Sequence, residues 1–360
     1  MRYPLECERK GKTNMGFMRE SLQHLEAYKA PYITTGIKLD ANENTHPIPE
    51  ALREHMKNWM DSMLVSLYPD TNSVSLCEAI AKAYEVPTDW VVMGVGSDQL
   101  IDYLLRAVLN AGDKALAPGP SFSMYKQSTS INGGELIEVP LTEDFSYDVE
   151  AYISAIQKEA PRVIFICNPN NPTGCALTQE ELERIIKSTT GLVIIDEAYG
   201  EFLGESSIPL TKKYDHLVVL KTFSKAYSLA GARVGYGVAQ AELIDMINKI
   251  RPPFNLNIFA QEAALWVISH REAFKASVQA IVEERERLRE ALSGLGLTVY
   301  PSKANFLWIE TPLALDEILA KEDIIIKKMS YHGKPYFRIS IGTPEENSCL
   351  LKVLEKEVKR

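Results

Sequence analysis

The chain has 360 residues, of which 46% are hydrophobic and 24% charged, and its formal net charge is −9. This length suffices for one large and one smaller domain, each with its own core. The negative charge argues against a surface for nucleic acid or anionic membranes, and no apolar run reaches the roughly 18 residues that a membrane-spanning helix needs.

The N-terminal residues form an arm rather than a core element. Polar and turn-forming residues dominate positions 20–49, and the Asn42-Glu43-Asn44 segment reads in isolation as a turn and helix cap. A helix is expected over about residues 49–63. Tyr68 then precedes a proline in an exposed turn, where its ring could pack locally.

The segment WVVMGVGSDQLIDYLLRAVL predicts a strand, a glycine turn and an amphipathic helix. Backbone N–H groups at a helix start bind phosphate well, and Gly96, Ser97 and Asp98 occupy that position. The glycine spacing does not match the dinucleotide fingerprint, which weighs against a nicotinamide cofactor. A further short strand and turn lead into a helix that carries Phe122 and Tyr125, and core packing is an alternative role for Tyr125.

Next come two apolar strands, each followed by polar residues. The residues Val163–Cys167 are continuously β-branched or aromatic, which is typical of a central parallel strand, and the dense turn NPNNPTG with Asn171 comes next. After a helix over 178–187 that opens with capping-box spacing, the strand LVIID ends at Asp196. A buried aspartate is costly unless it is paired, so Asp196 is either a ligand-binding carboxylate or part of a cap or salt bridge.

The segment LKTFSKAYSLAGARVGYG, residues 220–237, carries the strongest chemical signal. An apolar strand over Leu217–Leu220 leads to the hydroxyls of Thr222 and Ser224, then to Lys225, and Arg233 lies among small residues. Hydroxyls and a guanidinium suit a phosphate, and a lysine with a lowered pKa can act as a nucleophile. A lysine beside a phosphate cradle is what a pyridoxal phosphate site requires, although a lone lysine after a strand is usually a surface residue.

This pattern closely resembles the cofactor-lysine motif of the fold-type I aminotransferases, and in detail that of the histidinol-phosphate aminotransferase branch. The resemblance implies pyridoxal 5'-phosphate as cofactor. It also implies reversible transfer of an amino group between L-histidinol phosphate and 2-oxoglutarate in histidine biosynthesis. Asn171, Asp196 and Lys225 each follow an apolar strand, in the order that the family requires.

The resemblance implies a role for each candidate site residue. Lys225 would carry the pyridoxal and act as catalytic base, Asp196 would hold the protonated ring nitrogen, and Tyr199 would hydrogen-bond the ring oxygen. The cofactor-binding residues that it implies are Gly96, Ser97, Asp98, Phe122, Asn171, Asp196, Tyr199, Thr222, Ser224, Lys225, Arg233 and, from the neighbouring subunit, Tyr68. The substrate-binding residues that it implies are Tyr28, Asn44, Lys327 and Arg338.

Two residues depart from the usual family pattern. Phe122 stands where the family often has tyrosine, so it can stack on the cofactor ring but cannot donate a hydrogen bond. Lys327 stands where the family usually has arginine, and lysine lacks the two-pronged geometry of a guanidinium. A threonine-phosphate decarboxylase-like lyase and an aromatic-amino-acid aminotransferase of the same fold therefore stay open. The intact Lys225, Asp196 and Arg233 disfavour a catalytically idle binding domain.

The C-terminal third predicts one long helix and then an α+β segment. The helix is expected over about 259–293, with a solvated, charged second half EERERLRE. Arg338 lies within a later strand, where its charge should have an anionic partner.

The fold class expected is α/β, of the pyridoxal-phosphate-dependent transferase fold type I. It has a mostly parallel central sheet with helices on both faces, plus a smaller α+β domain. The expected divisions are an N-terminal arm with part of the small domain at 1–64, a large cofactor-binding domain at 65–260, and an interdomain helix with the small domain at 261–360.

The remaining expectations concern metals, partners and compartment. The five cysteines show no CxxC pair, and their odd number argues against a disulfide framework. The six histidines lack metal-ligand spacing, so no metal site is assigned. The N-terminal residues lack the apolar core of a signal peptide. We expect a cytoplasmic homodimer with shared active sites that binds a small-molecule amine and a 2-oxo acid, but no nucleic acid or membrane.

Overall fold

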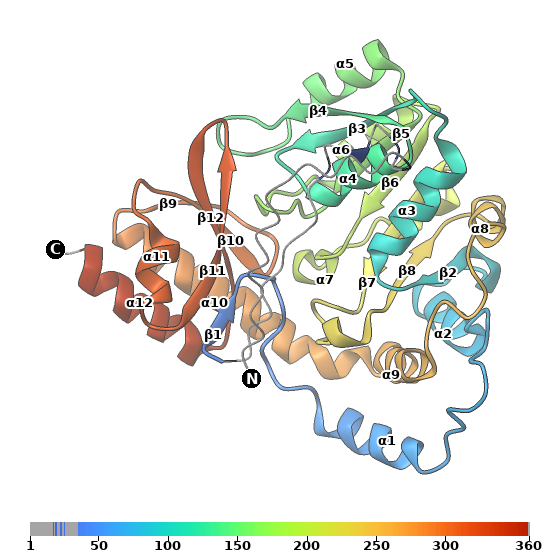
Figure 1. Ribbon diagram of the computed structural model, residues 1–360, viewed down its shortest axis with the longest axis horizontal. Coiled ribbons are helices and arrows are strands. Elements are labelled where there is room, and N and C mark those ends of the chain that lie inside the picture. Colours follow the sequence, from blue (N-terminus) through green and yellow to red (C-terminus); the bar gives the residue numbers. More distant parts are fainter. Residues whose placement is uncertain (1–16, 18, 20–21, 24, 26–34, 359–360) are drawn as a thin grey trace.

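The computed structural model describes residues 17, 19, 22, 23, 25 and 35–358, and two β-sheets organise these residues (Figure 1). The larger sheet has seven strands in the order β2-β8-β7-β6-β5-β3-β4. Its strands are β2 (Val91–Gly94), β3 (Lys114–Gly119), β4 (Glu135–Pro140), β5 (Val163–Cys167), β6 (Leu192–Asp196), β7 (Leu217–Thr222) and β8 (Gly235–Val238). The strands from β7 to β4 pair in parallel, and β8 runs antiparallel to both of its neighbours. The expected mostly parallel sheet is confirmed.

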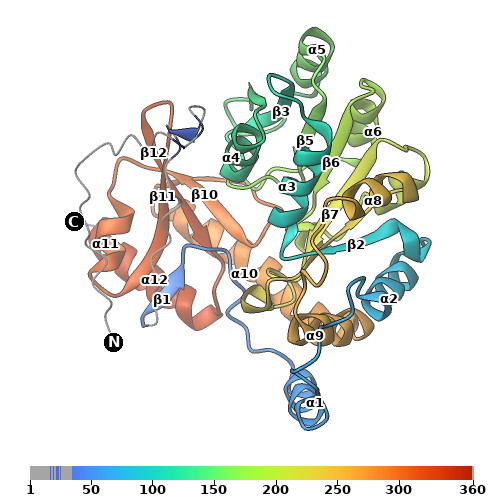
Figure 2. The same cartoon turned by 45° about the vertical axis from the view of Figure 1, so that its right-hand side comes forward.

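Helices cover both faces of the seven-stranded sheet (Figure 2). Every residue of β5 and β6 is buried, which explains their unbroken apolar sequences. One face packs against α2 (Val74–Tyr84), α5 (Val149–Glu159), α6 (Gln179–Lys187) and α9 (Ile258–Ser269). The other packs against α3 (Ser97–Val108), α4 (Ser123–Ile131) and α8 (Ala241–Asn248). The expected capping box of α6 is present, with Thr178 and Glu181 bonding each other's backbone N–H groups.

The smaller sheet joins the N-terminal part of the chain to its C-terminal third. Its order is β1-β11-β12-β10-β9, with β1 (Ile37–Leu39) parallel to β11 (Ile324–Tyr331). The other strands, β12 (Lys334–Ser340), β10 (Phe306–Glu310) and β9 (Thr298–Tyr300), pair antiparallel. Figure 1 shows α10 (Lys275–Gly294), α11 (Leu315–Ala320) and α12 (Pro344–Val358) beside this sheet. This is the expected α+β unit, while the domain boundaries given above stay a prediction.

The predicted single helix over 259–293 is wrong, because α9 and α10 are separate helices. His270 leaves the helical conformation, with φ −124° and ψ 30°. Its backbone N–H bonds the carbonyls of Trp266 and Val267, and its ring stacks on Trp266 at 4.3 Å. A short 3-10 helix, η5 (Arg271–Phe274), then leads into α10. The local interactions of His270 therefore end the helix that hydrophobic periodicity alone would continue.

The charged half of that helix is also only partly solvated. Glu284 and Arg285 are 7% and 4% exposed. Glu284 accepts hydrogen bonds from Arg287 and Asn347, and Arg285 donates to the carbonyl oxygen of Ala304. The prediction of a solvated face is therefore wrong for these two residues.

Short elements complete the described part of the chain. They are α1 (Glu50–Met60), α7 (Gly200–Leu203), η2 (Thr88–Trp90), η3 (Ile208–Lys212) and η4 (Ala230–Ala232). Helix α1 is shorter than the expected 49–63. Among the residues described, no helix combines the length and apolar character needed to span a membrane.

Candidate active site

The candidate site lies at the carboxyl ends of three neighbouring parallel strands. Strands β5, β6 and β7 pair in parallel, and Asn171, Asp196 and Lys225 lie at or just after their ends. One cavity brings these side chains together. It is lined by Gly96, Ser97, Asp98, Phe122, Cys167, Asn171, Asp196, Ala198, Tyr199, Thr222, Ser224, Lys225 and Arg233. Such strand ends are where open α/β sheets bind ligands.

Asp196 is a buried carboxylate with hydrogen-bond donors but no cationic partner. Its side chain accepts from the Tyr125 hydroxyl at 2.8 Å and from the Ala198 N–H at 3.0 Å, and the residue is 2% exposed. No lysine or arginine of the described residues lies within ion-pair distance of it. Burial raises the pKa of Asp196 to about 6. A protonated ring nitrogen would supply the missing partner, so this carboxylate fits a pyridoxal ring.

Lys225 lies in the same cavity with a lowered proton affinity. Its Nζ donates to the carbonyl oxygen of Ala41 at 2.8 Å. Burial, followed by the positive charge of Arg338, lowers the pKa of Lys225 to about 8. A larger fraction of this amine is therefore neutral near physiological pH than for an ordinary lysine, as a nucleophile or base requires.

The residues predicted to hold a phosphate group lie at and around the start of α3. Gly96 is the N-cap residue, and Ser97 begins the helix, so backbone N–H groups and the helix dipole face the cavity. From the other side, the Thr222 hydroxyl donates to Ser224 Oγ at 3.0 Å, and Arg233 Nη1 lies 3.3 Å from the same oxygen. These groups match the donors that the sequence predicted for a phosphate.

Close packing explains two glycines around these residues. A Cβ atom on Gly96 would lie 2.6 Å from Arg233 Nη2, and one on Gly235 would lie 2.4 Å from the backbone nitrogen of Ser97. Arg233 Nη2 also lies 3.4 Å from Asp98 Oδ2. Because Asp98 is negatively charged when ionised, we expect it to orient Arg233 rather than to bind phosphate directly.

Tyr199 and Asn171, the two residues predicted to bond the ring oxygen of a pyridoxal group, both line the cavity. Tyr199 is 5% exposed, and burial raises the pKa of its hydroxyl to about 12, so the hydroxyl stays protonated. Asn171 Oδ1 accepts a hydrogen bond from Arg338 Nη1 at 2.6 Å. Phe122 lines the cavity and meets Tyr125 edge-on, with ring centroids 5.6 Å apart.

The predicted substrate residues are only partly brought together. Asn44 Nδ2 donates to the carbonyl oxygen of Ala226, next to Lys225, at 3.1 Å. Arg338 reaches the site through Asn171, and Lys327 is its direct cross-strand neighbour on β11. Neither cation lines the cavity itself. Tyr28 lies outside the described residues.

Tyr68 lies away from the cavity of its own chain. It is 80% exposed, and its ring stacks on Phe254 at 4.5 Å. The structure of one chain therefore leaves the predicted contact with the cofactor phosphate of another subunit as a prediction.

Sequence reasoning missed two residues of this site. Tyr125, treated above as a possible core residue, donates to Asp196. Asn42 Nδ2 donates to the Tyr199 hydroxyl at 2.9 Å, and the residue is 1% exposed. Asparagine tolerates the left-handed backbone that Asn42 adopts here, with φ 54°.

Comparisons with known proteins agree with this geometry. The family model described as "Aminotransferase class I and II" matches residues 34–354. The histidinol-phosphate aminotransferase of Ruminiclostridium cellulolyticum is 39% identical over 346 residues, covering 94% of this chain and 97% of that protein. That of Carboxydothermus hydrogenoformans, named histidinol-phosphate aminotransferase 1, is 38% identical over 341 residues, covering 94% and 97%.

A solved structure shows the same fold. The histidinol-phosphate aminotransferase of Sinorhizobium meliloti, in complex with pyridoxal-5'-phosphate, superposes with a TM-score of 0.88. It is 22% identical, and the match covers 97% of this chain and 99% of that one. The α/β architecture, the strand-end cavity and the sequence similarity along the chain all point to the same family. This chain belongs to the class I and II aminotransferases, and within them to the histidinol-phosphate aminotransferase family.

Proposed function

We propose that this chain transfers an amino group between L-histidinol phosphate and 2-oxoglutarate, with pyridoxal phosphate as its cofactor. The observation that carries the proposal is the shared cavity of Asp196 and Lys225. It combines a buried carboxylate that lacks a cation with a lysine of lowered pKa. The names of the relatives described above support the choice of substrate.

Each residue of the site would have its own role in this reaction. Bound pyridoxal phosphate supplies a ring that withdraws electrons from the substrate carbon next to the amine. Asp196 would keep the ring nitrogen protonated, and the donors around Ser224 and Arg233 would hold the phosphate. Lys225 would attach the cofactor and, as a neutral amine, take a proton at Nζ and return it. Its pKa of about 8 leaves part of it neutral near physiological pH.

Lys327 and Arg338 are the proposed anion clamp for the far end of the substrate. They are Cα partners on β11 and β12, so their side chains leave the same face of the smaller sheet. Two neighbouring cations suit a phosphate dianion, whereas a single carboxylate needs only one of them. Arg338 also bonds the carbonyl oxygen of Asp40 at 2.5 Å, which ties the clamp to the segment beside Lys225.

The substrate is tested by Lys327→Ala, measured with two amines. We expect kcat/KM for histidinol phosphate to fall roughly 10- to 150-fold, because a hydrogen bond to a charged group contributes about 1.5–3 kcal/mol. Phenylalanine, which carries only a carboxylate, should lose much less. Equal losses for both amines, or a parent that prefers phenylalanine, would favour an aromatic-amino-acid aminotransferase. Release of carbon dioxide from phosphothreonine would favour the lyase.

The homodimer is part of the same proposal. Exposed apolar side chains gather on two segments that Tyr68 and Phe254 join by stacking. They are Met60, Leu64, Val65, Leu67, Tyr68, Val74, Phe254 and Phe259. Large exposed apolar patches commonly mark protein interfaces, and a second copy of the chain would cover this one. Tyr68 would then reach the cofactor phosphate of the partner subunit.

Tyr68→Phe tests this shared site, because it keeps the ring and removes only the hydroxyl. We expect the cofactor to bind about tenfold more weakly, while the dimer seen by sedimentation persists. A fully active monomer at assay concentration would contradict the homodimer. The proposed compartment is the cytoplasm, in keeping with the free thiols of the described cysteines Cys77, Cys167, Cys175 and Cys349.

A further inference from the structure

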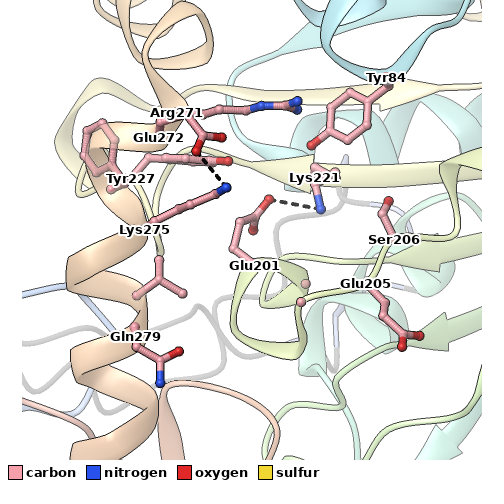
Figure 3. A pocket seen from close by; sticks show the side chains of 14 residues that line it. Tyr84, Glu201, Glu205, Ser206, Lys221, Tyr227, Arg271, Glu272, Lys275 and Gln279 are labelled. Carbon is pink, nitrogen blue, oxygen red and sulfur yellow. Dashed lines mark ion pairs between the residues drawn. The ribbon is translucent and has the colours of Figure 1, made fainter.

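A second cavity lies behind the strand ends, on the other side of β7 from the candidate active site. We call it the α7–α10 cavity, because it lies between α7 and the start of α10 (Figure 3). Successive side chains of a strand point to opposite faces, so Thr222 lines the active site while Lys221 lines this cavity. Its volume of about 510 Å³ is typical of small-molecule sites. None of the residues assigned above to cofactor or substrate lines it.

The deep end of the α7–α10 cavity carries a net negative charge. Lys221 Nζ lies 3.1 Å from Glu197 Oε2 and 3.0 Å from Glu201 Oε1. The side chains of these residues are 3%, 2% and 12% exposed, so two carboxylates share one ammonium group away from water. Burial lowers the pKa of Lys221, but the neighbouring acidic groups, with Glu201 first among them, outweigh burial and hold that pKa well above its usual value.

One oxygen at this deep end still lacks a donor. The second oxygen of Glu197 accepts from the Ser207 N–H, and Ser206 also donates to this carboxylate. Glu201 Oε2, by contrast, is buried without a hydrogen-bond partner among the described residues. A buried acceptor without a donor costs free energy, and a positively charged donor suits a site with surplus negative charge. An ammonium group meets both requirements.

The opposite wall supplies positive charge. Figure 3 shows the side chains of Arg271 and Lys275 projecting across the cavity from η5 and α10. Lys275 is paired with Glu272 at 2.6 Å. The Arg271 guanidinium bonds the carbonyl oxygen of Ala83 and lies over the ring of Tyr84, and within residues 35–358 no carboxylate lies within ion-pair distance of it. Its planar fork is suited to a carboxylate ligand.

Apolar side chains also line the cavity, beside these charged groups. Phe274 is 2% exposed, and Tyr227 and Val278 line the cavity with it. We propose that the α7–α10 cavity binds a free α-amino acid with an apolar side chain. The ligand's ammonium group bonds Glu201, its carboxylate bonds Arg271, and its side chain packs on Phe274 and Val278. This site is separate from the reaction proposed above and does not depend on it.

Calorimetric titration of the holoenzyme tests the ligand class. The probes are L-leucine and L-phenylalanine, followed by isopentylamine and 4-methylpentanoate, which lack the carboxylate and the ammonium group of leucine. We expect at least one amino acid to bind at millimolar concentration or below, and each truncated analogue of leucine to bind at least about tenfold more weakly than leucine. Binding of neither amino acid, or equal binding of leucine and its analogues, would overturn the proposal.

Two variants locate the binding. Arg271→Gln leaves the Lys221 ion pairs intact, and Glu201→Gln removes the carboxylate whose Oε2 lacks a donor. Each variant should weaken amino-acid binding about tenfold or more. The exposed Glu242→Gln on α8 is the matched control and should bind as the parent does. The cofactor's absorbance reports active-site binding separately and should respond alike in all variants. Unchanged calorimetric binding in Arg271→Gln would overturn the proposal even if Glu201→Gln failed to fold.

Discussion

Asp196 and Glu197 are adjacent residues at the end of β6 that face opposite sides of the sheet. Their interaction partners differ. On the back, Glu197 forms an ion pair with Lys221 at 3.1 Å and accepts further hydrogen bonds from Ser206 and Ser207. On the front, Asp196 accepts hydrogen bonds from Tyr125 and Ala198 but has no cation beside it. Both carboxylates are 1–2% exposed, so their different partners, rather than burial, separate them.

This comparison shows how a functional carboxylate differs from a structural one. The shift of the Asp196 pKa from 3.8 to about 6 corresponds to about 3 kcal/mol of unfavourable interaction with the ionised form. Glu197, by contrast, has a cationic partner within the chain, Lys221. At Asp196 the cost would be removed by a cation from outside the chain, such as the protonated ring nitrogen proposed above.

The largest effect should come from Lys225→Ala on the front face. We expect transamination to be lost, because no second lysine lines that cavity. The yellow colour of the bound cofactor should change as well, since its attachment point is gone. Single-turnover rates of the variant and the parent test the predicted loss of transamination. A near-parental rate would show that another group is the base.

Asp196→Asn and Glu197→Gln compare the two faces directly. Removing the front charge should slow transamination at least about a hundredfold, the lower range of general acid–base contributions, with the cofactor still bound. Removing the back charge should instead lower the melting temperature and change the rate much less, because it breaks a buried ion pair. If both variants lost rate equally, the distinction between the faces would be wrong.

Tyr125→Phe should have the smallest effect of these variants. The effect should be seen as a shift in the pH dependence of cofactor affinity. In the proposed site, ionised Asp196 holds the ring nitrogen, so cofactor affinity should fall as the pH drops through the Asp196 pKa of about 6. The Tyr125 hydroxyl lowers that pKa. Without it, we expect the fall in affinity to move to higher pH by about one unit. An unshifted profile would mean that Tyr125 only fills space.

The sequence predicted the parts of the site that depend on local patterns. Strand β5 has the predicted bounds, the strand before Asp196 ends where predicted, and the polar turns after these strands lie at one sheet edge as expected. The hydrogen bonds from Tyr125 to Asp196 and from Asn42 to Tyr199 could not be predicted this way. They join residues 71 and 157 positions apart, and only the packing of distant elements brings them together.

The pairing of β1 with β11 has a consequence for the order in which the chain is synthesised. Residues 40–42, which follow β1, contact Lys225, Arg338 and Ser340 through hydrogen bonds. The partner strands β11 and β12 leave the ribosome long after β1. Such long-range pairing forms slowly. The nascent chain can therefore assemble the seven-stranded sheet with Asp196 and Lys225 in place while their cover from residues 40–42 is still missing, and that cover closes only after β11 and β12 have been made.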